Sequence, residues 1–316
     1  MTPDVLSFGE TMVLLNPGAT GPLRYADRFA KRIGGAESNV AIGLARLGHD
    51  AAWASRLGDD PHGRYVRDTI RGEGVATHVT LDPEAPTGIM FKERREVGES
   101  RVFYYRHDSA ASRMSPEDLP AAALADADYL HLTGITPALS ERCRELCFEA
   151  ADRAREAGTR VSFDPNLRFK LWDEPAMRET LLPLAERADV VVPGIEEGEV
   201  LLGTDDPAGI AAGFRERGAE EVVVTLGAEG AYVAAEGVDE RVPGVTVERV
   251  VDTVGAGDGF VAGYLSGRLD GLDPATAADR ANVAGALATT VSGDIEGLPT
   301  RADLDLFGED GDRVTR

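Results

Sequence analysis

Cysteine is scarce in this sequence, and no apolar segment approaches the length of a membrane span. Cys143 and Cys147 are the only cysteines among 316 residues, four positions apart in one predicted helix. Neighbouring helical turns give poor disulfide geometry, and a second pair of zinc ligands is missing. We therefore expect two reduced thiols packed as small hydrophobic side chains. The first residues, MTPDVLSFGE, lack the basic and apolar regions of a signal peptide, so we expect a cytoplasmic protein.

Basic residues are also few, and lysine is almost absent. Lys31, Lys92 and Lys170 are the only lysines among 33 basic residues, against 55 acidic ones, and the formal net charge is −22. A field of this sign repels phosphate, which argues against nucleic acid or an anionic membrane as a partner. Such acidity with so little lysine resembles proteins of salt-adapted cells, where dense salt screens self-repulsion. The alternative is an ordinary acidic cytosolic enzyme encoded by GC-rich DNA.

Aromatic residues make up only 6% of the chain, so aliphatic side chains must form most of the core. Short β-branched segments alternate with longer amphipathic ones. We expect strands at AAWASRLG, DYLHLTG, TRVSFDP, ADVVVPG and EEVVVTLG, and helices at Glu37–Leu47, Ser140–Ala157, Ala176–Ala188, Pro207–Arg217 and Pro274–Val291. This alternation predicts an α/β protein: a three-layer α/β/α fold around a doubly wound, mainly parallel sheet, in a single domain over residues 1–316.

Two segments interrupt this alternation. Residues 10–33 and 86–106 look like extended hairpins without an intervening helix, and Gly98 in EVGES would serve the second turn. They predict a small β-sheet that forms a lid beside the main sheet. Because exposed strands of this kind often pair between subunits, we expect a homo-oligomer formed through the lid.

The stretch DTVGAGDGF, residues 252–260, carries the strongest chemical signal. Its small residues Gly255, Ala256 and Gly257 free successive N–H groups to surround an anion at the start of a helix. Asp258, in the first turn of that helix, would accept the proton of an alcohol that attacks phosphorus. In isolation, such a motif favours an aspartate that only caps the helix. It is neither a Walker loop nor a dinucleotide fingerprint.

Two further stretches accompany this one in the expected order. Together with GGAESNVAIGLARLG and VVVTLGAEGAY, it resembles the signatures of ribokinase-like (PfkB-type) carbohydrate kinases over nearly the whole chain. The resemblance implies ATP and Mg²⁺ as cofactors, Asp258 as the catalytic base and Gly255–Gly257 as the anion hole. It also places residues at the nucleotide, namely Thr225, Gly227 and Gly230 at ATP and Asn282 near the adenine.

One departure concerns the metal ion. The family commonly has an Asn-x-x-Glu motif near magnesium and the phosphates, and this stretch begins with Gly194 and ends with Glu197. The resemblance therefore implies that Glu197 handles Mg²⁺ through water, without the asparagine. Asp252 precedes the anion hole, and potassium binds there in some relatives, with carbonyl oxygens of TVSGDIEG as further ligands. The alternative is that Asp252 is a structural turn residue.

The sugar site is predicted from small, amide and guanidinium side chains. Gly34 and Gly35 let the backbone approach a sugar, and Asn39 offers both a donor and an acceptor. The alternative for the two glycines is a tight turn between a strand and a helix. The alternative for Asn39 is a helix cap or a solvated helix residue. In RVFYYR, strand alternation puts Val102, Tyr104 and Arg106 on one face and Arg101, Phe103 and Tyr105 on the other.

Arg106 and Arg168 have the planar fork that suits a carboxylate, although either is also compatible with a surface salt bridge. RVFYYR, HLTGITPALS and DPNLRFKLW resemble the 2-keto-3-deoxygluconate kinases of the family. That resemblance implies sugar-acid contacts by Gly34, Tyr104, Arg106, Arg168 and Asp258, with Asp294 as a further candidate. Met90 departs from the pattern, which has a tyrosine in the lid.

The expected reaction moves the γ-phosphate of Mg-ATP to the 6-hydroxyl of 2-keto-3-deoxygluconate, with 2-keto-3-deoxygalactonate as a further acceptor. A fructokinase, or another neutral-sugar kinase on the same scaffold, is the nearest alternative. A catalytically silent sensor of sugar or nucleotide is the alternative from another class.

Overall fold

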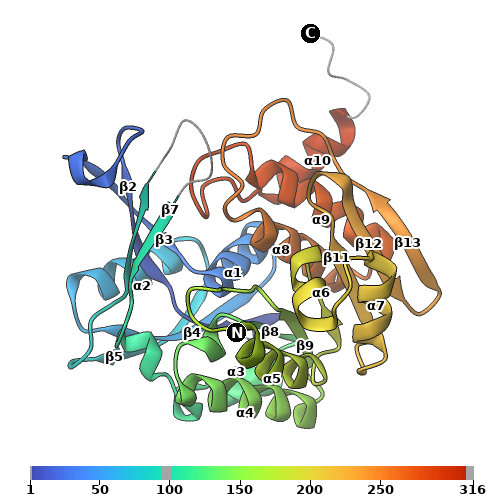
Figure 1. The fold of residues 1–316 in the computed structure, drawn as a ribbon, viewed down its shortest axis with the longest axis horizontal. Coiled ribbons are helices and arrows are strands. Elements are labelled where there is room, and N and C mark those ends of the chain that lie inside the picture. Colours follow the sequence, from blue (N-terminus) through green and yellow to red (C-terminus); the bar gives the residue numbers. More distant parts are fainter. Residues whose placement is uncertain (1, 94–100, 311–316) are drawn as a thin grey trace.

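The structure, a computed structural model, describes residues 2–93 and 101–310, and their strands form two sheets (Figure 1). The strands are β1 (Val5–Phe8), β2 (Met12–Pro17), β3 (Phe29–Gly34), β4 (Ala51–Gly58), β5 (Ala76–Asp82), β6 (Ile89–Glu93), β7 (Arg101–Tyr105), β8 (Tyr129–Thr133), β9 (Arg160–Asp164), β10 (Val190–Val191), β11 (Glu221–Thr225), β12 (Gly230–Ala235) and β13 (Val238–Pro243). The α-helices are α1 (Ala36–Arg46), α2 (Pro61–Gly72), α3 (Ala121–Asp126), α4 (Glu141–Ala157), α5 (Glu174–Ala185), α6 (Ile195–Leu202), α7 (Pro207–Arg215), α8 (Ala256–Leu269), α9 (Pro274–Ala288) and α10 (Arg301–Asp310).

The large sheet has the strand order β13-β12-β11-β10-β9-β8-β1-β4-β5. Its neighbours from β5 to β11 pair in parallel, and β12 and β13 form an antiparallel pair at one edge. The predicted doubly wound, mainly parallel sheet is therefore confirmed. In such a sheet the carboxyl ends of the parallel strands share one edge, and the loops that follow them meet there.

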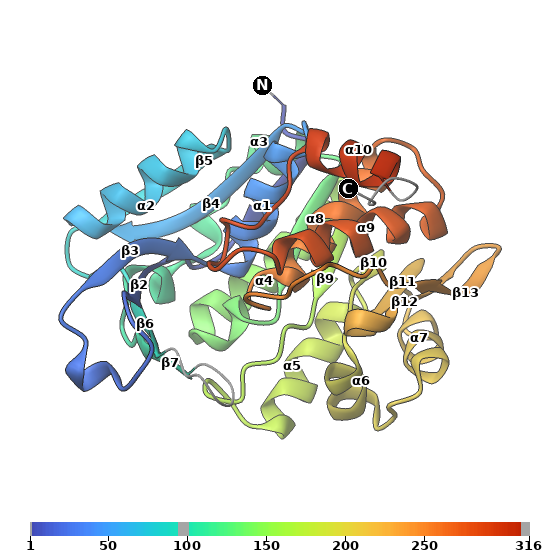
Figure 2. The same ribbon diagram turned by 90° about the horizontal axis from the view of Figure 1, so that it is seen from above.

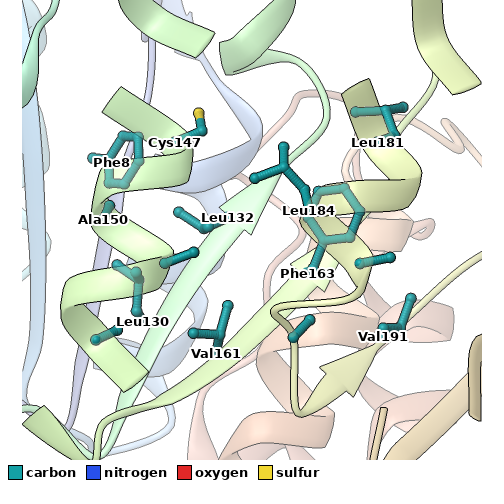
Figure 3. Packing of buried hydrophobic residues seen from close by; sticks show 14 of the residues in the cluster. Phe8, Leu130, Leu132, Cys147, Ala150, Val161, Phe163, Leu181, Leu184 and Val191 are labelled. Atoms are coloured by element: carbon teal, nitrogen blue, oxygen red, sulfur yellow. The ribbon is translucent and has the colours of Figure 1, made fainter. Parts of the chain in front are cut away.

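Hydrophobic side chains fill a layer on each face of the large sheet, because successive residues of a strand point to opposite faces. Val5 packs on the side of α1, α2, α8 and α9, whereas Leu6 packs on the side of α4, α5 and α7. Figure 2 shows helices on both faces. In Figure 3, Phe163 of β9 lies against Leu184 of α5, and Cys147 is part of the same layer. Cys143 and Cys147 are buried free thiols, as predicted.

The predicted elements are confirmed where local signals are strong. The strand at residues 51–58 has the predicted bounds, and Ser140 and Asp273 cap α4 and α9 with their side chains. Helix α9 ends at Ala288, three residues early, because the hydroxyl groups of Thr289 and Thr290 bond back to the last turn of the helix. Helices α2, α3, α6 and α10 were not predicted.

The small sheet has the order β3-β2-β6-β7, and its strands come from the two segments that interrupt the alternation. Figures 1 and 2 place it on the β4–β5 side of the large sheet. The turn predicted at Gly98 lies outside the described residues. None of the helices within residues 2–93 and 101–310 combines the length and apolar composition needed to cross a membrane.

Candidate active site

A cavity of about 350 Å³ lies where the inner face of the small sheet meets the loops at the carboxyl edge of the large sheet. All the residues predicted to contact the sugar line it, together with two glycines of the predicted anion hole: Gly34, Gly35, Asn39, Tyr104, Arg106, Arg168, Gly255, Gly257, Asp258 and Asp294. These residues come from β3, α1, β7, α8 and loops that are far apart in the sequence. The fold therefore gathers the predicted sugar residues into one site.

Asp258 is the third residue of α8 and is partly enclosed at the cavity. Asn39 of α1 donates a hydrogen bond from Nδ2 to Asp258 Oδ2 at 2.7 Å, which orients the carboxylate. Burial raises the pKa of Asp258, while the Asn39 hydrogen bond and the charge of Arg168 lower it. A carboxylate that is desolvated yet still ionisable is suited to accept a proton from a hydroxyl group.

The predicted anion hole is the amino end of α8. Gly255 has φ 79, a left-handed conformation that favours glycine, and a Cβ there would collide with the carbonyl oxygen of Asp294. The N–H of Ala256 donates to the carbonyl of Thr253 at 3.3 Å, and Ala256 does not line the cavity. The structure thus leaves Gly255 and Gly257, but not Ala256, at the cavity.

The face alternation predicted for RVFYYR is observed. Tyr104 and Arg106 line the cavity, whereas the side chains of Phe103 and Tyr105 are exposed. Glu10, which the sequence reasoning missed, forms an ion pair with the guanidinium of Arg106, and its side chain is only 1% exposed. Ser109 donates a hydrogen bond to the other oxygen of Glu10 at 2.5 Å. Glu10 therefore holds Arg106 in place at the rim of the cavity.

Arg168 approaches the cavity from the loop after β9. Its Nη1 donates to the carbonyl of Leu167 at 2.9 Å, and no salt bridge involves it among the described residues. Its guanidinium therefore keeps donors for a ligand, and its charge lowers the pKa values of Asp258 and Asp164.

Asp294 packs against Gly34, where a Cβ would collide with Asp294 Oδ2 and with the terminal methyl of Met90. Burial and neighbouring carboxylates raise the pKa of Asp294 to about 7, and the nearby charge of Lys92 opposes that rise. Asp252 accepts a hydrogen bond from Lys92 Nζ at 2.5 Å and another from the backbone N–H of Val254 at 3.3 Å. The sequence reasoning did not single out Lys92.

Asp164 and Glu197 form a second acidic group, close enough to Asp258 for its charge to act on Asp164. Burial raises the pKa of Asp164 to about 8, with further contributions from the charges of Glu197 and Asp258. Glu197 accepts the N–H of Gly194 at 2.9 Å, so it also closes the first turn of α6. The sequence reasoning missed Asp164, although its place at the end of β9, next to Arg168, is the expected place for a ligand contact.

The predicted nucleotide residues lie outside this cavity, around the β11–β12 turn. Thr225 ends β11, Gly227 begins a short 3₁₀ turn, and Gly230 begins β12 with φ 101. Asn282 of α9 donates from Nδ2 to the carbonyl of Pro243 at 3.0 Å, and Pro243 is the strand partner of Gly230. The fold thus brings Asn282 close to the glycine turn.

Residues 2–301 match the model of the pfkB family of carbohydrate kinases. The chain belongs to this family. The match spans nearly all of the sequence and confirms the resemblance noted in the glycine–aspartate and GGAESN stretches.

Known relatives of this pfkB kinase include both sugar-acid and neutral-sugar kinases. It is 42% identical over 310 residues to the 2-dehydro-3-deoxygluconokinase of Bacillus subtilis, covering 97% of this chain and 96% of that protein. It is 37% identical to the 2-dehydro-3-deoxygalactonokinase of Haloferax volcanii, covering 93% of each chain. It is 34% identical to Fructokinase-1 of Zea mays, covering 95% of this chain and 96% of that protein.

Solved structures confirm the family fold. A PfkB protein from Polaromonas superposes with a TM-score of 0.88 at 46% identity, covering 96% of this chain and 99% of that one. A putative ribokinase II from E. coli, in complex with ATP and Mg²⁺, superposes with a TM-score of 0.90 at 27% identity, covering 97% of this chain and 99% of that one.

Proposed function

We propose that this pfkB kinase transfers the γ-phosphoryl group of ATP to the 6-hydroxyl of 2-keto-3-deoxygluconate, also named 2-dehydro-3-deoxygluconate, with 2-keto-3-deoxygalactonate as a second acceptor. The observation that carries the proposal is the presence of Arg106 and Arg168 in the cavity that also holds Asp258. A carboxylate at one end of the acceptor and a hydroxyl at the other match these two functions. The names of the relatives from Bacillus subtilis and Haloferax volcanii support the same choice.

In the proposed step, the 6-hydroxyl oxygen attacks the γ-phosphorus atom. The new O–P bond forms as the bond from the γ-phosphorus to the β,γ-bridging oxygen breaks, and the electron pair leaves with ADP. The hydroxyl proton passes to the carboxylate of Asp258, which Asn39 orients. The backbone N–H groups at Gly255 and Gly257 donate hydrogen bonds to the phosphoryl oxygens and so stabilise the negative charge that spreads over them.

Asp164 and Glu197 fit the magnesium ion that accompanies ATP. Burial and the neighbouring charge of Glu197 raise the pKa of Asp164, and the charge of Arg168 opposes that rise only in part. Among those residues, no three His, Cys, Asp or Glu side chains converge as metal ligands, and Mg²⁺ commonly takes one or two carboxylates together with substrate phosphates. We assign Glu197, through water, and Asp164 to this ion, which when bound neutralises charge on the phosphates.

Asp164→Asn is expected to stabilise the protein without ligands. Because the folded pKa of Asp164 lies at about 8, above its ordinary value of 3.8, its contribution to stability is present in acid and is lost as pH rises to 8. The variant should therefore melt about 2–4 °C above the wild type at pH 8 and with a smaller difference at pH 5. Scanning fluorimetry measures both values, and Asp205→Asn, on an exposed loop, is the control.

The same variant also tests the assignment of the metal ion. Mg²⁺ with ADP should raise the melting temperature of the wild type and of Asp205→Asn, but raise that of Asp164→Asn less. An equal magnesium-dependent shift in all three proteins would contradict the placement of the ion at Asp164.

A phosphorylation screen tests the substrate directly. Both keto-deoxy acids, fructose and ribose should be compared as acceptors at high and low potassium chloride. Preference for the acids supports the proposal, preference for fructose supports the fructokinase alternative, and no ATP consumption supports a silent sensor. The potassium arm tests the predicted cation site, where the ammonium of Lys92 already pairs with Asp252 and would compete with K⁺.

We also propose that the small sheet acts as a lid over the substrate and that its outer face joins subunits in a homo-oligomer. Phe91 lies edge-to-face between Phe29 and Tyr105, with ring centroids 5.5 and 5.6 Å away. Phe103 is 42% exposed and Tyr105 67% exposed on this face. An aromatic surface of this kind is typical of an interaction site.

Tyr105→Arg is expected to convert the oligomer to a monomer, because it places a charge at the most exposed ring of this aromatic face. Light scattering after size-exclusion chromatography measures the mass. Tyr25→Arg, which changes another exposed tyrosine, should keep the mass of the wild type. A monomeric wild type would contradict the proposed assembly.

A further inference from the structure

Lys92 occupies an unusual place for a lysine, in β6 on the inner face of the small sheet. It lines the cavity, yet its side chain is only 3% exposed. Among the described residues, Asp252 is the only group that accepts a hydrogen bond from its Nζ. An ammonium group has three donors, so two of them lack a protein acceptor within the described residues. A buried cation with open donors beside a cavity indicates an anionic ligand.

The composition makes this lysine more informative. Only three of the 33 basic residues are lysines. Lys31 stacks over the ring of Tyr65, and Lys170 is exposed and donates to the carbonyl of Val102 at 2.8 Å, so Lys92 alone among the three is buried. An ammonium is a compact point charge, whereas a guanidinium is a broad planar fork. Lys92 therefore places a compact charge, and not a planar fork, at the cavity.

The partner of Lys92 places its charge near the predicted anion hole. Asp252 begins the loop that leads into α8, and the next three residues, Thr253, Val254 and Gly255, all line the cavity. The carboxylates of Asp258 and Asp294 face the same space. Three acidic groups here would repel an incoming phosphoryl group, and Lys92 supplies positive charge to offset them.

We propose that Lys92 is a further catalytic residue of the phosphoryl transfer. Its ammonium donates hydrogen bonds to non-bridging oxygens of the phosphoryl group during transfer, while it retains Asp252 as a second partner. This inference rests on the kinase function proposed above. The transition state spreads negative charge over these oxygens, so a cation placed there speeds the chemical step more than it strengthens ground-state binding. No bond to Lys92 forms or breaks, and its proton stays on Nζ.

The position of Lys92 also gives the small sheet a chemical role. Because β6 carries the ammonium, the sheet must lie over the cavity for the charge to reach the phosphoryl group. Closure of the small sheet over the sugar would then also bring the Lys92 ammonium to the phosphoryl group. Without a bound sugar the charge would be out of place, which would disfavour transfer of the phosphoryl group to water.

Lys92→Met is expected to lower kcat about 100-fold and to leave KM for ATP within about threefold of the wild-type value. Lys92→Arg keeps the charge, so its kcat should lie between those of Lys92→Met and the wild type. Lys31→Met, a change of the same type in β3 that does not line the cavity, should behave as wild type. Near-wild-type turnover in Lys92→Met would overturn the proposal.

A structural role for the Lys92–Asp252 ion pair predicts a different pattern. If the pair only holds the fold, Asp252→Asn should lose as much activity as Lys92→Met. If Lys92 contacts the phosphoryl group, Asp252→Asn should stay within about tenfold of wild type. The double variant Lys92→Met/Asp252→Asn removes the unpaired charge, so it keeps the test valid where Lys92→Met alone fails to fold. The kcat of this double variant should remain about 100-fold below that of the wild type.

Binding of a transition-state mimic provides a readout that does not need turnover. Calorimetry with ADP and aluminium fluoride should show about 100-fold weaker binding for Lys92→Met, and unchanged binding for ADP alone. Equal losses for both ligands would overturn the proposal. The kinetic ratio is measured with whichever sugar the wild type phosphorylates fastest. Failure on keto-deoxy acids would therefore contradict the proposed substrate without deciding the role of Lys92.

Discussion

Asp258→Asn is expected to lower kcat for the sugar acid about 1,000-fold while leaving ATP affinity nearly unchanged. Asparagine has the same shape, and its amide oxygen still accepts the hydrogen bond that Asn39 makes to Asp258 at 2.7 Å. It cannot accept the proton of the acceptor hydroxyl, so only the chemical step should suffer. A coupled ADP-release assay measures kcat, and calorimetry measures ATP binding.

A second helix start provides the control for Asp258. Asp273 caps α9 with its side chain, and asparagine is an equally good cap, so Asp273→Asn should keep full activity. If both substitutions were harmless, Asp258 would be a helix-end residue only. Retention of most of the wild-type rate by Asp258→Asn would contradict its assignment as the base.

The pH profile should report the same carboxylate. The base must be ionised, and burial raises its pKa, so activity should fall in acid at a higher pH than for an exposed aspartate. Asn39 lowers this pKa through its hydrogen bond. Asn39→Ala should therefore move the acid limb of kcat/KM to higher pH.

Arg106→Ala is expected to lower kcat/KM for 2-keto-3-deoxygluconate about 100-fold or more and to leave any activity on fructose within about threefold. The guanidinium would pair with the carboxylate of the acid, a group that fructose lacks. Steady-state kinetics with both acceptors measure the difference. An equal loss on both sugars would contradict carboxylate recognition and favour a structural role for Arg106.

The buried partner of Arg106 makes a stability control necessary. Removing Arg106 leaves Glu10, which is 1% exposed, without its cation. The double variant Glu10→Gln/Arg106→Ala removes that unpaired charge and should fold better while remaining poor on the sugar acid. Arg101→Ala, on the outer face of the same strand, should keep wild-type kinetics.

Local sequence determined a large part of this protein. The period-two pattern of RVFYYR separated Tyr104, which lines the cavity, from the exposed Tyr105, because side chains alternate along a strand. The predicted helices Ser140–Ala157 and Pro274–Val291 begin at the observed starts of α4 and α9, where Ser140 and Asp273 bond to free backbone N–H groups. The glycines around Asp258 marked a helix start with a carboxylate beside it.

Only the tertiary structure decided which of these faces meet. Lys92 and Asp252 lie far apart in the sequence, and so do Glu10 and Arg106, yet each pair forms an ion pair beside the cavity. Periodicity tells which residues share a face of a strand, but the partner of that face depends on how the small sheet lies on the large one. The raised pKa of Asp164 has the same origin, since it needs burial together with Glu197 and Asp258 from two other elements. The sequence by itself therefore determined the family and predicted the base and the sugar-facing side chains, whereas the packing of the two sheets determined which charged groups surround them.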